Sequence, residues 1–368
     1  MPPVSVLVVD DSVVVRKLVT QILDADPDLR VVGTAANGRI ALEKLSLLAP
    51  DIVTLDIEMP DMDGLETLAA LRKIAPRLPV IMFSTLTERA AASTLDALAL
   101  GASDYVTKPT QLKNPAEALE AVRQQLVPKI KALTGRTRRA PLATAPSASR
   151  PVGVRPVQRR IGPPARPHVL AIGSSTGGPD ALATLVAKLP AGLPVPIVVV
   201  QHMPPLFTRL FAQRLDRLTG VTVREAVDRE PLRPGEMLIA PGDRHLTLRR
   251  DGDRVVTVLN DGMPENHCRP AVDVLFRGVV EVYGANVLSL ILTGMGQDGL
   301  RGGERVVEAG GALWAQDQAT SVVWGMPGAV VNAGLASRVL PAPEIGAAVA
   351  AALTGSPEPS PFRAGALR

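Results

Sequence analysis

Short apolar runs alternate with amphipathic stretches over residues 1 to about 125. The runs have the length of buried strands, and stretches such as Val13–Leu23 and Leu65–Ile74 repeat their apolar residues at helical spacing. Alternation of this kind predicts strand–helix units that form one parallel, doubly wound sheet. The expected strands are Val4–Val9, Arg30–Ala35, Ile52–Asp56, Val80–Ser84 and Ser103–Thr107.

The alternation resumes at His168 and continues to about Leu353. Asp251-Gly252, placed between two apolar runs, predicts a hairpin turn. Both halves are therefore of the α/β class: a flavodoxin-like five-stranded sheet, then a doubly wound, Rossmann-like, mostly parallel sheet. The expected strands of the second half are Val169–Gly173, Ile197–Gln201, Met237–Ala240, Leu246–Arg249, Val255–Leu259, Val287–Thr293 and Ala312–Gln316.

The segment between the two halves is rich in Pro, Ala, Arg and Ser and has no periodicity. Such a sequence cannot bury enough apolar surface to offset its ordering entropy. We therefore expect a domain at 1–125, a linker at 126–166, a second domain at 167–355 and a flexible tail at 356–368. A solvated spacer is the simplest interpretation of the linker, and a specific binding arm is the alternative.

The net charge of +4 belongs mainly to this segment. Of the 40 Lys and Arg residues, ten lie between Lys129 and Arg166, which leaves 30 basic against 36 acidic residues elsewhere. A domain that binds nucleic acid is therefore not expected.

A single cysteine, Cys268, excludes an intramolecular disulfide, and no role can be assigned to it. Without a signal sequence or an apolar run long enough for a bilayer, a cytoplasmic protein with no membrane insertion is expected.

Acidic residues gather at the predicted carboxyl edge of the first sheet. Asp10 and Asp11 follow the first strand, and Asp56 ends the third. Carboxylates that meet at such an edge repel one another unless a hard cation such as Mg²⁺ lies among them. That cation would also favour phosphoryl transfer to a carboxylate nucleophile. Alternatively, Asp11 and Ser12 only cap the following helix.

Two further residues at the same edge can bind an anion. Ser84 ends the fourth strand and can donate a hydrogen bond to a phosphoryl oxygen. Lys108, before Pro109, follows the fifth strand and supplies a cation. Aspartates, serine and lysine at the ends of four different strands together indicate a site for phosphoryl chemistry.

A glycine-rich turn follows the first strand of the second half. Gly173, Ser175 and Gly177 fit G-x-S-x-G, a sharp turn that exposes a serine nucleophile. The same residues could instead form a phosphate-binding loop at a helix N-terminus. The absence of a lysine after the glycines argues against a Walker-type loop.

A serine nucleophile needs a base and an acid that orients it. His202 directly follows the strand Ile197–Gln201, on the same edge as Ser175, and Asp298 follows the strand Val287–Thr293. Asp298 could alternatively only cap the next helix. The other histidines are placed less well: His168 precedes a strand, and His245 and His267 are expected to be exposed.

The first half resembles a response-regulator receiver domain. The resemblance rests on Asp10-Asp11, Asp56, Ser84 and Lys108-Pro109, together with Met59-Pro60 and Asp63-Gly64. It implies that a histidine kinase phosphorylates Asp56. It also implies that Mg²⁺ is held by Asp10, Asp11, Asp56 and the Glu58 carbonyl. Tyr105 matches the family's aromatic switch, although it could equally just fill space beside the last strand.

The second half resembles the chemotaxis protein-glutamate methylesterase family, in which the order along the chain is Ser, His, Asp. The matching motifs are Ser175-Thr-Gly-Gly, Gln201-His-Met-Pro, Arg269-Pro-Ala-Val-Asp and Thr293-Gly-Met-Gly-Gln-Asp-Gly, with Ala240-Pro-Gly and Ala315-Gln-Asp similar as well. Family members commonly have Ser at the position of Ala271 and Glu at that of Gln318. The resemblance implies a Ser175–His202–Asp298 triad, with oxyanion donors expected at the Thr176 and Met295 backbone.

The two resemblances together imply hydrolysis of glutamate methyl esters on chemotaxis receptors, with release of methanol, and deamidation of receptor glutamines. The esterase reaction is expected to need no cofactor. We expect the unphosphorylated receiver domain to restrict access to Ser175 and phosphorylation of Asp56 to release it. The alternatives are a scaffold that binds partners without catalysis and a DNA-binding response regulator, which would require a helix-turn-helix.

Overall fold

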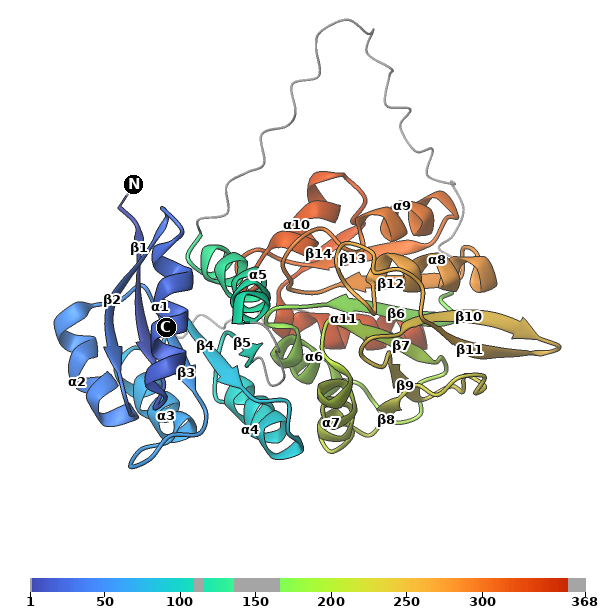
Figure 1. The fold of residues 1–368 in the computed structure, drawn as a ribbon. Helices are drawn as coiled ribbons and strands as arrows, with labels where there is room; N and C mark the ends of the chain where they lie inside the picture. The colour runs from blue at the N-terminus through green and yellow to red at the C-terminus, as the bar shows by residue number, and fades with distance from the viewer. Residues whose placement is uncertain (1, 109–114, 136–165, 357–368) are drawn as a thin grey trace, which may run out of the picture. The chain divides into compact units, whose positions relative to one another are not determined.

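The computed structural model describes residues 2–108, 115–135 and 166–356, which form an N-terminal and a C-terminal unit (Figure 1). Most of the predicted linker, Pro109 and the tail from residue 357 lie outside the described residues.

The N-terminal unit is a parallel five-stranded sheet with the strand order β2-β1-β3-β4-β5. Helices α1 and α5 cover one face, and α2, α3 and α4 cover the other (Figure 1). The predicted flavodoxin-like fold is confirmed. Its elements are β1 (Val4–Val9), α1 (Val13–Asp24), β2 (Leu29–Ala35), α2 (Gly38–Leu48), β3 (Ile52–Asp56), α3 (Gly64–Ile74), β4 (Val80–Ser84), α4 (Glu88–Ala99), β5 (Asp104–Thr107) and α5 (Pro115–Leu133).

Helix α5 continues past residue 125, where the first domain was expected to end. Leu126 and Ile130 are fully buried in the core of this unit, although Pro128 interrupts the helical hydrogen bonding between them. Lys129 and Lys131, which we counted with the linker, form ion pairs with aspartates of the unit. The proline and the basic residues led us to assign this part of the helix to the linker. Its buried apolar face stabilises the helix.

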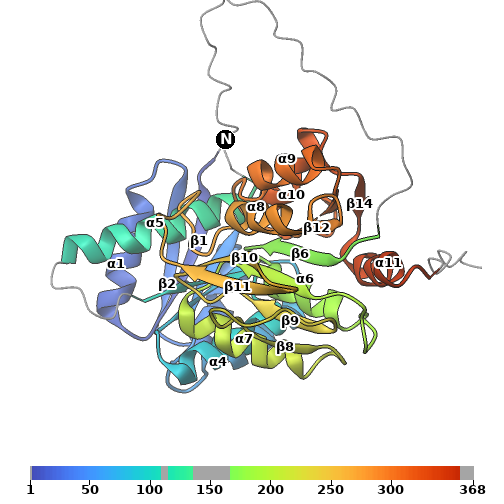
Figure 2. The ribbon, with the colours of Figure 1, turned by 90° about the vertical axis from the view of Figure 1, so that its right-hand side faces the viewer.

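The C-terminal unit is a parallel seven-stranded sheet with the order β14-β13-β12-β6-β7-β9-β8. Helices α8, α9 and α10 cover one face, and α6 and α7 the other, while β10 and β11 form a separate antiparallel hairpin (Figure 2). The edge strands β8 and β14 were not predicted because they are short and carry charged residues. The elements are β6 (Val169–Ser174), α6 (Gly178–Val186), β7 (Ile197–Gln201), α7 (Pro205–Asp216), β8 (Thr222–Glu225), β9 (Glu236–Ile239), β10 (His245–Asp251), β11 (Arg254–Asn260), α8 (Val272–Tyr283), β12 (Val287–Ile291), α9 (Leu300–Glu308), β13 (Ala312–Gln316), α10 (Gly325–Asn332), β14 (Arg338–Leu340) and α11 (Ala342–Thr354).

The strand order fixes where each unit can bind a ligand. The chain leaves β6 toward β7 on one side and later returns to β12 on the other side. In the N-terminal unit the same reversal lies between β1 and β3. Open parallel sheets bind ligands at the carboxyl ends of the strands beside such a reversal.

Candidate active site and acidic cluster

The predicted acidic residues of the N-terminal unit converge at the reversal point. Carboxylate oxygens of Asp10, Asp11 and Asp56 lie within 4.8 Å of one another. Lys108 bridges two of them, with its ammonium 2.8 Å from Asp10 Oδ2 and 2.7 Å from Asp56 Oδ2. One ammonium leaves three carboxylates with excess negative charge in a largely buried place. The donor set therefore fits a hard divalent cation such as Mg²⁺.

Burial is the main influence on Asp56, which is only 3% exposed. Removal from water raises the pKa of Asp56 to about 6, although hydrogen bonding and charge attraction from Lys108 oppose this rise and Asp10 adds to it. An aspartate in the unfolded chain ionises near pH 3.8. The folded state therefore holds its proton to higher pH, and stability falls as the pH rises from about 4 to above 6.

We expect Asp56→Asn to stabilise the protein at neutral pH. Removing a buried carboxylate whose pKa is raised to about 6 should increase the free energy of unfolding by about 1–3 kcal/mol at pH 7.5 and by less at pH 5. Urea denaturation of both proteins without divalent cations, followed by circular dichroism, measures the difference. An Asp56→Asn variant that is less stable than the wild type at pH 7.5 would contradict this view of the cluster.

Ser84 and Tyr105 face the interior of the N-terminal unit. The Ser84 hydroxyl accepts a hydrogen bond from Thr94 Oγ1 at 2.7 Å and lies 3.1 Å from the Thr85 carbonyl. Tyr105 is buried, and the Lys129 ammonium lies 5.1 Å from its ring centroid. The side chains of Ser84 and Tyr105 therefore contact neighbouring residues of the unit rather than the acidic cluster.

The turn after β6 separates the two adjacent serines. Ser174 is fully buried, and its hydroxyl donates to Gln201 Oε1 at 2.7 Å. Ser175 is half-buried, and its carbonyl accepts from Gln201 Nε2 at 3.0 Å. Gly177 then adopts a φ of 75°, where a Cβ atom would lie 2.6 Å from the Val322 side chain. The turn therefore requires glycine, and it leaves Ser175 as the serine at the carboxyl edge.

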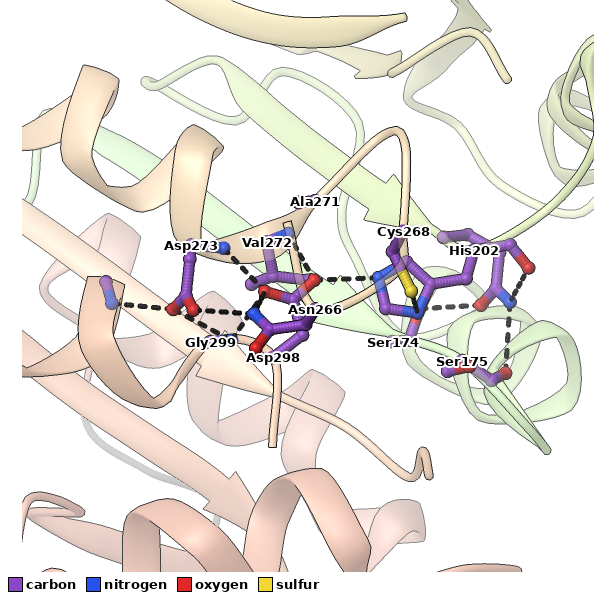
Figure 3. Close-up of polar contacts among 12 residues, drawn as sticks. Ser174, Ser175, His202, Asn266, Cys268, Ala271, Val272, Asp273, Asp298 and Gly299 are labelled. Atoms are coloured by element: carbon purple, nitrogen blue, oxygen red, sulfur yellow. Dashed lines mark hydrogen bonds and ion pairs between the residues drawn. The ribbon is translucent and has the colours of Figure 1, made fainter. Parts of the chain in front are cut away.

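His202 and Asp298 form a close pair beside this turn (Figure 3). His202 Nε2 lies 2.9 Å from Asp298 Oδ2, and the Asp298 side chain is only 2% exposed. Oδ2 also accepts a hydrogen bond from the Val272 amide, and Oδ1 accepts one from the Asp273 amide. The amino end of α8 thus stabilises the Asp298 carboxylate.

This environment shifts both pKa values of the pair. Burial disfavours the imidazolium, but the Asp298 carboxylate and the Cys268 sulfur, 3.6 Å from Nδ1, raise the pKa of His202 above its ordinary value. Burial would likewise raise the pKa of Asp298, but His202 and the α8 amides hold it below its ordinary value. Asp298 is therefore an anion that favours a charged His202.

The loop that carries Met295 packs directly on Ser175. The Ser175 amide donates to the Thr293 carbonyl at 3.1 Å. A Cβ atom on Gly294 would lie 2.9 Å from Ser175 Cβ, so this position has no room for a side chain. Thr176 is buried and Met295 half-buried beside this contact. Within the described residues the Ser175 hydroxyl makes no hydrogen bond to His202, and such contacts are often loose before substrate binds.

The remaining histidines differ in their surroundings. His168 and His267 are exposed. The prediction that His245 is exposed is wrong, since it is 2% exposed. Its Nδ1 accepts from the Ala271 amide at 3.2 Å, and its Nε2 lies 3.1 Å from the Met263 carbonyl. Hydrogen bonds to the backbone at both ends of the loop 263–271 keep His245 buried, although it begins β10.

The comparisons with known proteins agree with this arrangement. The model of the CheB methylesterase family matches residues 170–349, and that of the response regulator receiver domain matches residues 6–120. A protein-glutamate methylesterase/protein-glutamine glutaminase from Nocardioides sp. is 54% identical over all of both chains. The chain belongs to the CheB methylesterase family. A relative of the same name from Trichodesmium erythraeum is 48% identical, over 93% of this chain and 96% of its own.

Two solved structures of CheB domains from Thermotoga maritima are similar to parts of this chain. The catalytic domain is 46% identical and covers 49% of this chain and 95% of its own, with a TM-score of 0.48. The response regulator domain is 42% identical and covers 37% of this chain and 99% of its own, with a TM-score of 0.33.

Membership of the CheB methylesterase family confirms both resemblances seen in the sequence. A methylesterase domain follows the receiver domain. Receiver domains bind Mg²⁺ for phosphorylation, and the acidic cluster offers suitable donors. Among the described residues no helix is long and apolar enough to cross a membrane.

Proposed function

We propose that this chain is a phosphorylation-activated enzyme that hydrolyses glutamate methyl esters on chemotaxis receptors and deamidates receptor glutamines. The hydrogen bond between His202 and Asp298, located beside the Ser175 turn at the reversal point of the sheet, carries the proposal. The names of the relatives support the two reactions.

Ser175 acts as the nucleophile, and His202 acts as the general base. Because Asp298 occupies Nε2, the proton from the Ser175 hydroxyl goes to Nδ1 of His202 while Oγ bonds to the ester carbonyl carbon. The imidazolium then returns this proton to the leaving methoxide, and methanol departs from an acyl-enzyme. Water repeats the sequence and frees the glutamate. An amide substrate releases ammonia by the same route.

The oxyanion formed in each step is stabilised by the backbone N–H groups of Thr176 and Met295. Thr176 follows the nucleophile, and Met295 follows the glycine that packs on Ser175. This arrangement uses only protein groups, so we propose that the esterase reaction needs no cofactor.

Asp56 accepts a phosphoryl group from a chemotaxis histidine kinase. Asp10, Asp11, Asp56 and the Glu58 carbonyl would hold Mg²⁺, which offsets the charge of the incoming phosphoryl group. Lys108 binds the transferred group, and Ser84 and Tyr105 change rotamer to follow it. Because each makes contacts within the unit before phosphorylation, the two states differ in the hydrogen bonds and packing around α4 and β5.

Regulation is tested by methanol release from methylated receptor membranes, with wild type and Asp56→Ala. We expect a small-molecule phosphodonor with Mg²⁺ to raise the rate of the wild type and to leave that of Asp56→Ala unchanged. Equal stimulation of both proteins would disprove activation through Asp56.

A cytoplasmic location is part of the same proposal, and cell fractionation tests it.

A further inference from the structure

A tight turn between β11 and α8 lies over the His202–Asp298 pair. The Glu265 amide donates to the Cys268 carbonyl at 3.1 Å, and the Cys268 amide donates to the Glu265 carbonyl at 2.8 Å. The two central residues, Asn266 and His267, have φ values of 52° and 63°. Two consecutive left-handed residues closed in this way form a type I′ turn, and asparagine is among the residues that tolerate this conformation.

The side chain of Asn266 joins two buried carboxylates. Its Nδ2 lies 2.9 Å from Asp273 Oδ2 and 3.0 Å from Asp298 Oδ1 (Figure 3). Asp273 is 1% exposed and Asp298 2% exposed. The Gly299 amide also lies 3.0 Å from both Asp273 Oδ1 and Asp298 Oδ1. Two shared donors therefore lie between carboxylates that would otherwise repel each other.

These contacts fix the rotation of the Asp298 carboxylate. Oδ1 accepts from Asn266, the Asp273 amide and the Gly299 amide, whereas Oδ2 faces the Val272 amide and His202. Asn266 is the only side chain among the donors to Oδ1 that the described part of the chain provides. Without the Asn266 amide, the carboxylates of Asp273 and Asp298 would repel each other more strongly. The Asp298 side chain would then be freer to turn away from His202.

We propose that Asn266 is a positioning residue for the esterase reaction, holding Asp298 so that Oδ2 aligns His202 with Ser175. This inference rests on the proposed triad. Asn266 contacts Asp298 on the carboxylate oxygen that His202 does not use, so its effect on His202 passes through the Asp298 carboxylate. The pKa directions agree with this role. Burial and, after it, the charge of Asp298 raise the pKa of Asp273, whereas the pKa of Asp298 lies below its ordinary value.

The turn has anchors that do not depend on the Asn266 side chain. Glu265 forms an ion pair with Arg277 of α8, and His245 bonds to the backbone at Met263 and Ala271. Glycine at position 266 would keep the left-handed backbone. Asn266→Gly therefore removes the amide while it preserves the turn.

The test compares Asn266→Gly with His267→Gly, a matched change at the neighbouring left-handed position of the same turn. We expect Asn266→Gly to lower kcat for methyl-ester hydrolysis by about tenfold or more, because a hydrogen bond to a charged group is lost, with KM within about twofold. His267→Gly should stay within about twofold of wild type. The downfield proton resonance of the His202–Asp298 hydrogen bond should shift only in Asn266→Gly.

Asn266→Asp provides a second test, because it keeps the shape of the side chain and replaces the amide donor by a third carboxylate. It should lower kcat at least as much as Asn266→Gly. If kcat and the proton resonance of Asn266→Gly match those of His267→Gly, the positioning role is overturned while the triad stands. If Ser175→Ala retains wild-type activity, the proposed function itself fails.

Discussion

Asp298→Asn is expected to lower kcat by about 10⁴-fold while the fold is preserved. Asparagine has the same shape, but its amide group lacks the charge that stabilises the His202 imidazolium. If its oxygen takes the position of Oδ1 and keeps the hydrogen bond from the Asp273 amide, the NH₂ group faces the histidine and forces the ring proton onto Nδ1. Nδ1 then cannot accept the proton of Ser175.

Steady-state methanol release from methylated receptor membranes measures this loss. Asp251→Asn, at the exposed turn of the β10–β11 hairpin, is the matched control and should behave as the wild type. A fall of less than about tenfold for Asp298→Asn would show that Asp298 mainly binds the backbone amides at the amino end of α8.

Ser175→Ala is expected to lower kcat by about 10⁴-fold or more, because alanine has no hydroxyl group with which to form the acyl-enzyme. His202 has no role in catalysis once the nucleophile is absent. The double variant Ser175→Ala/His202→Ala should therefore be no slower than Ser175→Ala alone, since the members of a triad act as a unit. A further large loss in the double variant would mean that His202 activates water independently of Ser175.

The residues that directly follow strands could be predicted from the sequence. Asp10, Asp56, Ser175 and His202 lie at strand ends, and parallel strands bring their carboxyl ends to one edge. Alternation of apolar and polar segments was enough to find those strands. Asp298 was found because its glycine-rich loop follows a strongly apolar strand.

The groups that support these residues could not be predicted. Gln201 and Asp273 lie among apolar residues of a strand and a helix, and only the folded structure brings them to the Ser175 turn and to Asp298. Asn266 depends on an unusual pair of left-handed residues for which the sequence Asn-His is a weak signal. The burial of His245 depends on contacts with a loop that is distant along the chain.

The comparison of Ser175→Ala with Ser174→Ala tests the central claim most directly. The two serines are adjacent, but only Ser174 is buried with its hydroxyl bonded to Gln201. Its loss should cost about 1 kcal/mol of stability and little activity. We predict that, with phosphodonor and Mg²⁺ present, Ser174→Ala releases methanol from methylated receptor membranes and Ser175→Ala does not. Release by Ser175→Ala at the wild-type rate would contradict the account.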